Sequence, residues 1–316
     1  MKNIVITGAS SFVGYHLAKH FSNVGNVIAT ITKPISEYEA IRKKRLELLS
    51  SKVILAHLDI SAPEQLKDFI KTHKPELWIH HAGYVQNYAS PDYDLKDANR
   101  INVDPLFTLV PLLKEFACKK LLVSGSSMEY ADSDLKHSEE ENGLPSFPYG
   151  ASKLLETQES LRLASKVGLS TTVIRIFNPF GLFDTPAKLF PFLVTQLLSQ
   201  KKVELSPCLQ VRNFVHVETL CDIYDFFAHK TESEIVNACP HEGIVLAEFL
   251  KKLAGELKVN STLLDFGKKQ MREGEPMICD ASNKKLYARG FLPKYSLDDE
   301  IKKYADEITQ NKELFL

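Results

Sequence analysis

Six short runs of mostly β-branched and apolar residues alternate with longer amphipathic stretches through the first part of the chain. They cover residues 4–7, 26–32, 52–58, 76–80, 119–124 and 170–177. This alternation is typical of consecutive βαβ units, whose strands lie parallel and whose helices cover both faces of one sheet. We therefore predict an α/β fold built on a doubly wound parallel sheet.

The alternation stops after residue 177. Residues 178–186 have the composition of a loop, and the later strand candidates, 234–238 and 262–266, lie among helical stretches. A chain of 316 residues is long enough for two domains. We predict a first domain over residues 1–177 and a smaller lobe over 178–316, with some segments of the lobe returning to the sheet.

Composition excludes several classes of partner and site. Lys and Arg total 39 and Asp and Glu total 40, so the net charge of -1 gives no field that would attract nucleic acid or an anionic membrane. The five cysteines have no CxxC spacing, and we expect neither a disulfide framework nor a metal site. The first strand starts at Ile4 and no apolar run approaches the roughly 20 residues of a membrane span, so we expect a cytoplasmic protein. The basic run 42–45 is predicted to be a solvated helix face.

A glycine-containing turn follows the first strand, in the segment VITGASSFVG. Glycine is needed where backbone approaches a ligand closely, and the helix that starts near Phe12 would point its N-terminal N–H groups at a pyrophosphate. Gly8, Ser11, Phe12 and Gly14 are therefore predicted to bind a dinucleotide.

The pentapeptide YGASK places Tyr149 and Lys153 four residues apart, on one face of a helix. An ammonium beside a phenol favours the phenolate and lowers the pKa of the tyrosine from about 10 toward neutrality. Such a tyrosine can exchange a proton with a carbinol oxygen while a hydride moves on or off the attached carbon.

The order TGASSFVG, LLVSGSSMEY and YGASK resembles the extended short-chain dehydrogenase/reductase family, of the NAD-dependent epimerase/dehydratase type that modifies nucleotide sugars. The resemblance covers nearly the whole chain, although Ser11 replaces the middle glycine of the family turn. It implies a Rossmann-type first domain that binds the dinucleotide and carries the catalytic residues, and a mainly substrate-binding lobe. The cofactor contacts that it implies further along the chain are Asp59, Ile60, His81, Ala82, Gly83, Tyr149, Lys153 and Phe177.

The catalytic hydroxyl of the family lies four residues before a tyrosine, and this spacing from Tyr130 selects Ser126. Its role would be to hydrogen-bond the substrate oxygen. Ser124 and Ser127 remain alternative assignments. Ser127 and Met128 stand where dehydratases of the family carry an acidic or Ser/Glu pair, and both are expected to contact the substrate.

The end of the second strand predicts the cofactor. NAD-binding units usually carry an acid there for the ribose hydroxyls, but residues 26–34 contain none. Thr30, Thr32 and Lys33 are suited to a 2′-phosphate, so NADP(H) is favoured and NAD(H) is the alternative. The alternative is that these three residues are simply a solvated strand end with no role in cofactor binding.

The family resemblance also assigns substrate contacts in the lobe. In RIFNPFG, Asn178 matches an asparagine that bridges cofactor and sugar diphosphate, and in QVRNFVHVETL, Arg212 matches an arginine that binds the diphosphate. Arg272 matches a second such arginine, and two guanidiniums suit a pyrophosphate. Asn213 and Thr219 replace acids that are usual in the family. The expected partner is a nucleoside-diphosphate sugar.

GSSMEY resembles the corresponding segment of 4-keto-6-deoxy sugar nucleotide reductases. We therefore predict an NADPH-dependent reductase of a nucleotide-activated 4-keto sugar. A nucleotide-sugar 4-epimerase with retained NAD is the alternative, followed by a dehydratase and by a non-catalytic cofactor-binding regulator. The resemblance also implies a homodimer that packs the helices at about 99–116 and 149–167. The stripe of Leu106, Leu109 and Leu113 would lie either in that interface or against the sheet.

Overall fold

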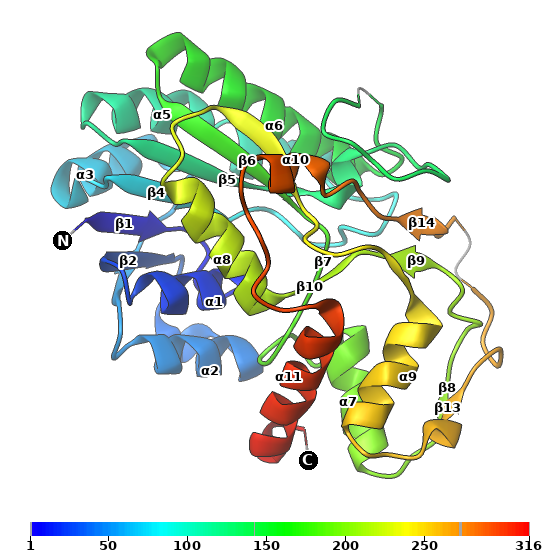
Figure 1. The fold of residues 1–316 in the computed structure, drawn as a ribbon. Coiled ribbons are helices and arrows are strands. Elements are labelled where there is room, and N and C mark those ends of the chain that lie inside the picture. The colour runs from blue at the N-terminus through cyan, green and yellow to red at the C-terminus, as the bar shows by residue number, and fades with distance from the viewer. Residues whose placement is uncertain (1, 142, 272–273, 316) are drawn as a thin grey trace. The chain divides into compact units, whose positions relative to one another are not determined.

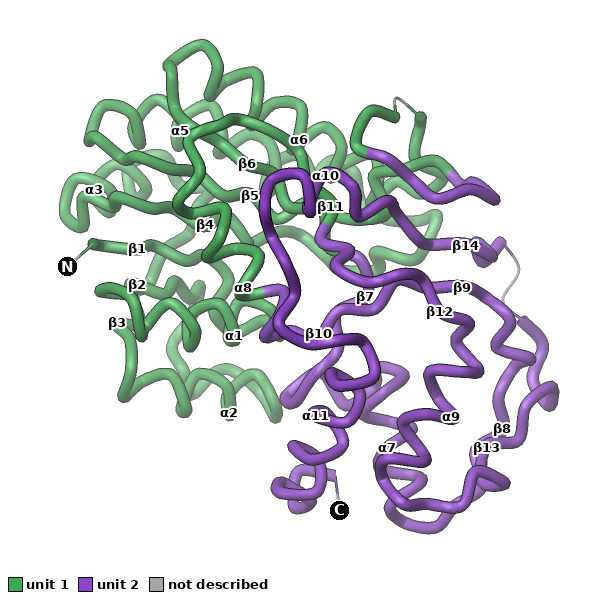
Figure 2. Tube along the Cα trace, viewed as in Figure 1, with its two compact units in different colours: residues 1–131, 139–176, 221–237 green, residues 132–138, 177–220, 238–316 purple. Residues whose placement is uncertain are grey.

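The computed structural model describes residues 2–141, 143–271 and 274–315 (Figure 1). The chain divides into two compact units, coloured separately in Figure 2. Unit 1 comprises Met1–Ala131, Glu139–Ile176 and Cys221–Asn237, and unit 2 comprises Asp132–Ser138, Phe177–Leu220 and Ala238–Leu316. None of the helices in the described part of the chain has the length and apolar character that a bilayer span requires.

A seven-stranded sheet forms the centre of unit 1, in the order β11-β6-β5-β4-β1-β2-β3. Its strands are β1 (Asn3–Ile6), β2 (Asn26–Ile31), β3 (Ile54–His57), β4 (Leu77–His80), β5 (Lys120–Ser126), β6 (Ser170–Ile176) and β11 (Glu234–Ala238). All neighbours from β3 to β6 pair in parallel. The order reverses between β1 and β4, as in a doubly wound Rossmann-type sheet. The predicted fold class is confirmed, and the bounds of the first six strands lie within two residues of those predicted.

Helices cover both faces of this sheet (Figure 1). On one side α1 packs on α2, and on the other α5 packs on both α3 and α6. The helical elements are α1 (Phe12–Phe21), η1 (Ile35–Glu37), α2 (Ala40–Leu49), α3 (Pro63–His73), α4 (Leu95–Ala98), η2 (Asn99–Val103), α5 (Leu106–Glu115), η3 (Ser127–Glu129), α6 (Pro148–Val167) and α8 (Val217–Ala228).

The leucine stripe of α5 belongs to the core of unit 1. Leu106, Leu109 and Leu113 are all 0% exposed and cluster with sheet residues such as Trp78 and Val123. Burying such side chains stabilises a fold by about 1.5 to 3 kcal/mol each. The stripe was predicted to lie either in a dimer interface or against the sheet. In the structure it packs against the sheet, and these leucines are not at an exposed interface.

The basic run at the start of α2 is only partly a solvated face. Arg45 is 1% exposed, and its Nη1 donates to the carbonyl oxygen of Ser10 at 2.8 Å, inside the glycine-containing turn. The expectation was wrong for Arg45 because the inner face of α2 packs on α1, next to this turn. Arg42, Lys43 and Lys44 are exposed or half-exposed, as expected.

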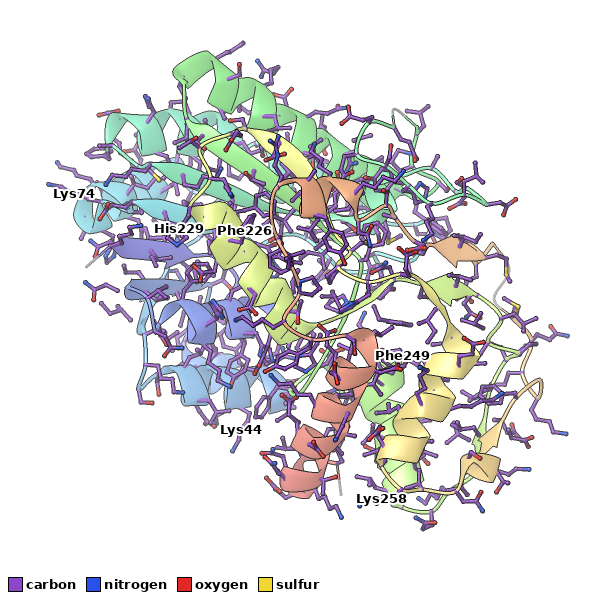
Figure 3. All side chains as sticks on the ribbon, in the orientation of Figure 1. Lys44, Lys74, Phe226, His229, Phe249 and Lys258 are labelled. Carbon is purple, nitrogen blue, oxygen red and sulfur yellow. The ribbon has the colours of Figure 1, made fainter. Side chains whose placement is uncertain are left out.

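Unit 2 has three small sheets and a separate aromatic core. Its elements are β7 (Asn178–Phe180), α7 (Leu189–Leu198), β8 (Val203–Glu204), β9 (Val211–Arg212), β10 (Phe214–His216), β12 (Ile244–Val245), α9 (Leu246–Glu256), η4 (Ser261–Leu263), β13 (Leu264–Asp265), β14 (Ile278–Cys279), α10 (Lys284–Ala288), α11 (Leu297–Gln310) and η5 (Lys312–Leu314). Phe249, labelled in Figure 3, is fully buried, and its ring centroid lies 4.4 Å from that of Phe214 and 4.8 Å from that of Phe190.

Candidate active site

The turn after β1 is built for a close approach. Gly8 has φ +79°, a conformation that favours glycine. A Cβ at Gly14 would lie 2.2 Å from the carbonyl oxygen of Gly8, so the first turn of α1 could not pack on the strand end with any larger residue there. The N-terminus of α1 thus points its free N–H groups at the carboxyl edge of the sheet, where a dinucleotide pyrophosphate would bind.

Ser11 replaces a glycine of the family motif, and the structure shows what its side chain does. It is the N-cap of α1, and its Oγ accepts from the N–H of Gly14 at 3.0 Å. The same Oγ lies 3.0 Å from Nε2 of His81, whose Nδ1 lies 2.8 Å from Oγ of Ser124. His81 therefore joins the turn after β1 to strand β5, a pairing that the sequence did not predict.

Glycine also determines where Tyr149 lies. Tyr149 is in the first turn of α6, and a Cβ at the next residue, Gly150, would be 1.9 Å from the carbonyl oxygen of Met128. The absence of a side chain lets the start of α6 contact η3, which follows Ser126 directly. This contact places the Tyr149 phenol near the Ser126 side chain, which acts to lower the pKa of the phenol.

We expect Gly150→Ala to destabilise the protein by about 1 to 3 kcal/mol, the usual cost of overpacking, because backbone must move. Turnover should fall as well, since the Tyr149 to Ser126 distance changes. Gly255→Ala on α9 is the matched control: nothing lies within 4 Å of the added carbon, so stability should stay level or rise by up to about 1 kcal/mol. Urea unfolding measures both, and equal effects at the two sites would contradict the packing argument.

Among the three candidate serines, the contacts favour Ser126. Ser124 is 4% exposed, and its Oγ is already engaged by His81 and by the hydroxyl of Tyr224 at 2.7 Å. Ser126 ends β5, and its Oγ accepts from the N–H of Met128 at 3.2 Å while facing Tyr149. Ser127 and Met128 are half-buried residues of η3. Ser126 is therefore the hydroxyl positioned to share a substrate oxygen with the tyrosine.

The pKa of Tyr149 departs from the expectation drawn from YGASK. Burial raises the pKa of this phenol, and Lys153 lowers it by a smaller amount. Glu156 adds a further raising effect, because its carboxylate accepts from Nζ of Lys153 at 2.5 Å and opposes the ammonium charge. The expectation that Lys153 lowers this pKa toward neutrality was therefore wrong, since burial and Glu156 outweigh Lys153.

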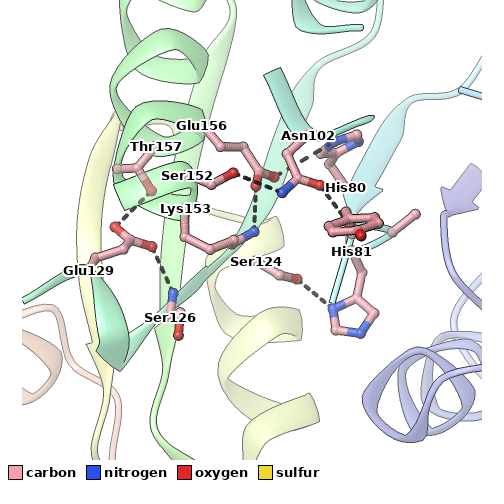
Figure 4. Close-up of polar contacts among 12 residues, drawn as sticks. His80, His81, Asn102, Ser124, Ser126, Glu129, Ser152, Lys153, Glu156 and Thr157 are labelled. Atoms are coloured by element: carbon pink, nitrogen blue, oxygen red, sulfur yellow. Dashed lines mark hydrogen bonds and ion pairs between the residues drawn. The ribbon is translucent and has the colours of Figure 1, made fainter. Parts of the chain in front are cut away.

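Glu129 has a structural role that its place in GSSMEY did not reveal. It is 1% exposed; Oε1 accepts from the N–H of Ser126 at 2.7 Å and Oε2 accepts from Thr157 at 2.9 Å (Figure 4). Oε2 also accepts from Nε of Arg175 at 2.8 Å. It therefore fixes the end of β5 against α6 and β6. A carboxylate with these partners is not placed to exchange protons with a substrate.

The end of β2 presents two of the three predicted phosphate contacts. Thr32 is exposed, its backbone N–H donates to the Tyr38 hydroxyl at 3.1 Å, and Lys33 lies over the ring of Tyr38 with Nζ 5.0 Å from the centroid. Thr30 is 3% exposed within the sheet. Thr32 and Lys33 are therefore the accessible members of the set.

The remaining predicted cofactor residues of unit 1 line the ends of β3 and β4. Asp59 is exposed and its Oδ1 accepts from both the N–H and the hydroxyl of Ser61, at 2.9 and 2.7 Å, whereas Ile60 is buried. The N–H groups of His81 and Ala82 each donate to Oγ1 of Thr7 at 2.8 Å. A Cβ at Gly83 would lie 3.2 Å from Oδ1 of Asn102.

The substrate residues predicted in the lobe belong to unit 2, as does the buried Phe177 that was assigned to the cofactor, whereas Ser127 and Met128 belong to unit 1. Nδ2 of Asn178 donates to the carbonyl oxygen of Asn213 at 3.0 Å. Nη2 of Arg212 donates to Oε1 of Glu275 at 3.0 Å, and the arginine side chain is 12% exposed. Arg272 lies outside the described residues.

The two residues that replace family acids both donate to carboxylates. Nδ2 of Asn213 donates to Oδ1 of Asp280 at 2.8 Å, and the hydroxyl of Thr219 donates to Oε1 of Glu300 at 2.5 Å. An acid in place of Asn213 or Thr219 would put a second carboxylate beside Asp280 or Glu300 and would supply no hydrogen-bond donor. The amide and the hydroxyl at these two positions supply that donor.

One group of unit 2 has the geometry of a cation site. Ligand atoms of His216, Glu218 and Glu307 lie within 4.8 Å of one another. Lys303 donates to Glu218, and Nε2 of His216 lies 3.3 Å from Oε2 of Glu307. These ion pairs account for the grouping without a metal.

Three residues of the site were missed from the sequence: Arg45, Glu156 and Tyr93. The ring of Tyr93 lies edge-on to that of Tyr149, with centroids 5.6 Å apart. Glu156 had a readable signal, since it follows Lys153 by three residues on one helix face. Arg45 and Tyr93 had none, because the segments that they contact are remote in sequence.

Comparison with known proteins identifies the family. The sequence model of the family described as "NAD dependent epimerase/dehydratase family" matches residues 4–239. The UDP-glucuronate 4-epimerase of Thermodesulfobacterium geofontis is 23% identical, over 98% of this chain and 97% of its own length. The CDP-abequose synthase of Salmonella typhimurium is 22% identical, over 92% and 93%.

A solved structure with the same fold is the dTDP-glucose 4,6-dehydratase of Bacillus anthracis in complex with NAD. It has a TM-score of 0.83 and 20% identity, and the match covers 99% of this chain and 98% of that one. With three quarters of its length matched by the family model and an intact Ser, Tyr and Lys set, the chain belongs to the NAD dependent epimerase/dehydratase family, whose members are enzymes of the extended short-chain dehydrogenase/reductase type.

Proposed function

We propose that this enzyme is an NADPH-dependent reductase of a nucleotide-activated 4-keto sugar. NADPH would deliver a hydride to the keto carbon, Tyr149 would give its proton to the oxygen, and Ser126 would orient that oxygen. Lys153 would bind the nicotinamide ribose. The relatives named for UDP-glucuronate and CDP-abequose support a nucleotide sugar as the substrate class.

The observation that carries the cofactor choice is the end of β2. No carboxylate occurs from residue 26 to 34, and the exposed Thr32 stands beside Lys33. A ribose hydroxyl pair would lack its usual acceptor there, whereas a 2′-phosphate would meet a hydroxyl and an ammonium.

We expect NADPH to bind more tightly than NADH, and Thr32→Asp to reverse the order because its carboxylate repels the 2′-phosphate. Fluorescence titration of both dinucleotides measures this. Thr32→Asn is the control, since it keeps the size of the substitution without the charge. Equal affinities in the parent protein, or a preference for NADH, would contradict the assignment.

Two related reactions compete with the reduction. A 4-epimerase with retained NAD is favoured by the relative that covers 98% of the chain. A dehydratase is disfavoured because Ser127 and Met128 supply no acid and Glu129 is buried against Arg175. Mass spectrometry of the dinucleotide that co-purifies separates epimerase from reductase, and a panel of nucleotide sugars with NADPH absorbance identifies the substrate.

We also propose a homodimer formed through the outer sides of α5 and α6. These helices pack on each other, and Phe107 and Leu155 are exposed on them at 52% and 37%. The buried leucines of α5 play no part in this proposal.

A further inference from the structure

Glu156 lies one helical turn beyond Lys153 on α6, on the same face of the helix. Its Oε2 accepts from Nζ of Lys153 at 2.5 Å (Figure 4). The two side chains are 1% and 9% exposed, so solvent does not screen the pair. The ammonium that should act on Tyr149 is thus already opposed by a buried carboxylate.

Among the residues described, Lys153 is the charged cation paired with Glu156. His80 on β4 faces it, with Nε2 3.8 Å from Oε1, and burial lowers the pKa of His80 to about 3, which keeps the imidazole neutral. Oε1 of Glu156 and both His80 nitrogens are buried and have no hydrogen-bond partner among the residues described. Lys153 is therefore the group that balances this carboxylate.

Other titratable groups around the Tyr149, Lys153 and Glu156 set come from several elements. They are His80 and His81 at the end of β4, Tyr88 and Tyr93 in the following loop, Glu129 on η3 with its partner Arg175 on β6, and Tyr224 on α8. Glu129 is held by Arg175, and burial raises the pKa of both Tyr93 and Tyr224, which keeps these two phenols neutral near pH 7. Glu156 is thus the carboxylate bound directly to Lys153.

We propose that Glu156 is a positioning residue that holds the Lys153 ammonium and opposes its charge, so that Tyr149 rests as a neutral phenol poised to donate a proton. In a reduction, the hydride of NADPH forms the new C–H bond and the phenol proton completes the hydroxyl. The phenolate that remains is reprotonated from solvent. An oxidation would need the phenolate first, which this arrangement disfavours. The catalytic direction rests on the proposed reductase function, whereas the resting state of Tyr149 does not.

The resting state can be measured without any substrate. Because the chain has 11 tyrosines, the ultraviolet titration of the parent protein is compared with that of Tyr149→Phe, and the difference isolates one phenol. Burial raises the pKa of Glu156 to about 7 against the pull of Lys153, so the carboxylate is charged throughout a titration from about pH 8 upward. We expect Tyr149 to ionise at or above the reference value of about 10. Ionisation of Tyr149 below about pH 9 in the parent protein would overturn the proposal.

Glu156→Gln keeps the size of the side chain and removes its charge. With Lys153 unopposed, Tyr149 should ionise about one pH unit or more below the parent. The matching double variant with Tyr149→Phe supplies the baseline, and melting temperature with NADPH binding establishes that the variant is folded. Glu156→Asp retains the negative charge, so Tyr149 should ionise at a pH close to that in the parent protein. An unchanged or higher titration in Glu156→Gln would overturn the proposal.

The same variants test the role of Glu156 separately from the proposed reductase function. In a reduction that needs the phenol, Glu156→Gln should move the alkaline decline of kcat to lower pH by the same amount as the titration. If the titration shifts and no keto sugar is reduced, only the reductase assignment fails. If reduction proceeds with no shift in either profile, the role of Glu156 fails and the reductase stands.

Discussion

Replacing Tyr149 with Phe is expected to lower turnover by roughly 10²- to 10⁴-fold, the usual contribution of a general acid, while NADPH binding stays close to that of the parent protein. The variant removes one hydroxyl and keeps the ring. That ring lies edge-on to Tyr88 and Tyr93, at centroid distances of 5.7 and 5.6 Å, and these contacts do not depend on the hydroxyl. Steady-state kinetics and fluorescence titration of NADPH measure the two properties separately.

Tyr93→Phe is the control for this experiment. It removes the hydroxyl of a neighbouring ring. That hydroxyl donates to the carbonyl oxygen of Tyr84 at 2.9 Å. We expect a much smaller loss of turnover, because Tyr149 and Ser126 remain. If Tyr149→Phe kept the parent turnover, another group would have to donate the proton, and the assignment of Tyr149 would be wrong.

Replacing Arg212 with Met is expected to weaken nucleotide-sugar binding by about 1.5 to 3 kcal/mol, the scale of a hydrogen bond to a charged group. This corresponds to roughly a ten- to hundred-fold rise in Kd. Arg212 pairs with Glu275, so a diphosphate would replace one anionic partner with another. Met keeps much of the apolar stem, and calorimetry with a nucleoside diphosphate measures the change.

Arg100→Met controls for the loss of an arginine. Arg100 forms an exposed pair with Asp97, and the two side chains are 55% and 46% exposed. Such pairs contribute little, so binding should not change. NADPH affinity should be level in both variants, because the predicted pyrophosphate contacts are at the turn from Gly8 to Gly14. If Arg212→Met left diphosphate binding intact, a free ketone or aldehyde would become the leading substrate class.

The role of Glu129 shows what the resemblance of a short segment leaves open. Its place before Tyr130 resembled a reductase segment, and the structure gives it an N–H, a hydroxyl and a guanidinium to bind. Two of these partners, Thr157 and Arg175, lie 28 and 46 residues away in sequence. The segment alone therefore could not separate packing from chemistry.

The sequence by itself determined the first six strands of the sheet, the glycine turn and the spacing of Tyr149 and Lys153, but not the short strands of unit 2 such as β7, which lies in a segment expected to be a loop. These features depend on local periodicity and on steric limits that act within a few residues. Only the tertiary structure decided that Arg45 supports the turn, that the α5 leucines face the sheet and that Glu156 opposes Lys153. Each of these depends on burial or on contact between elements that meet only in the folded chain. Burial removes the solvent that would otherwise weaken a charge, so the protonation of Tyr149 follows from tertiary packing.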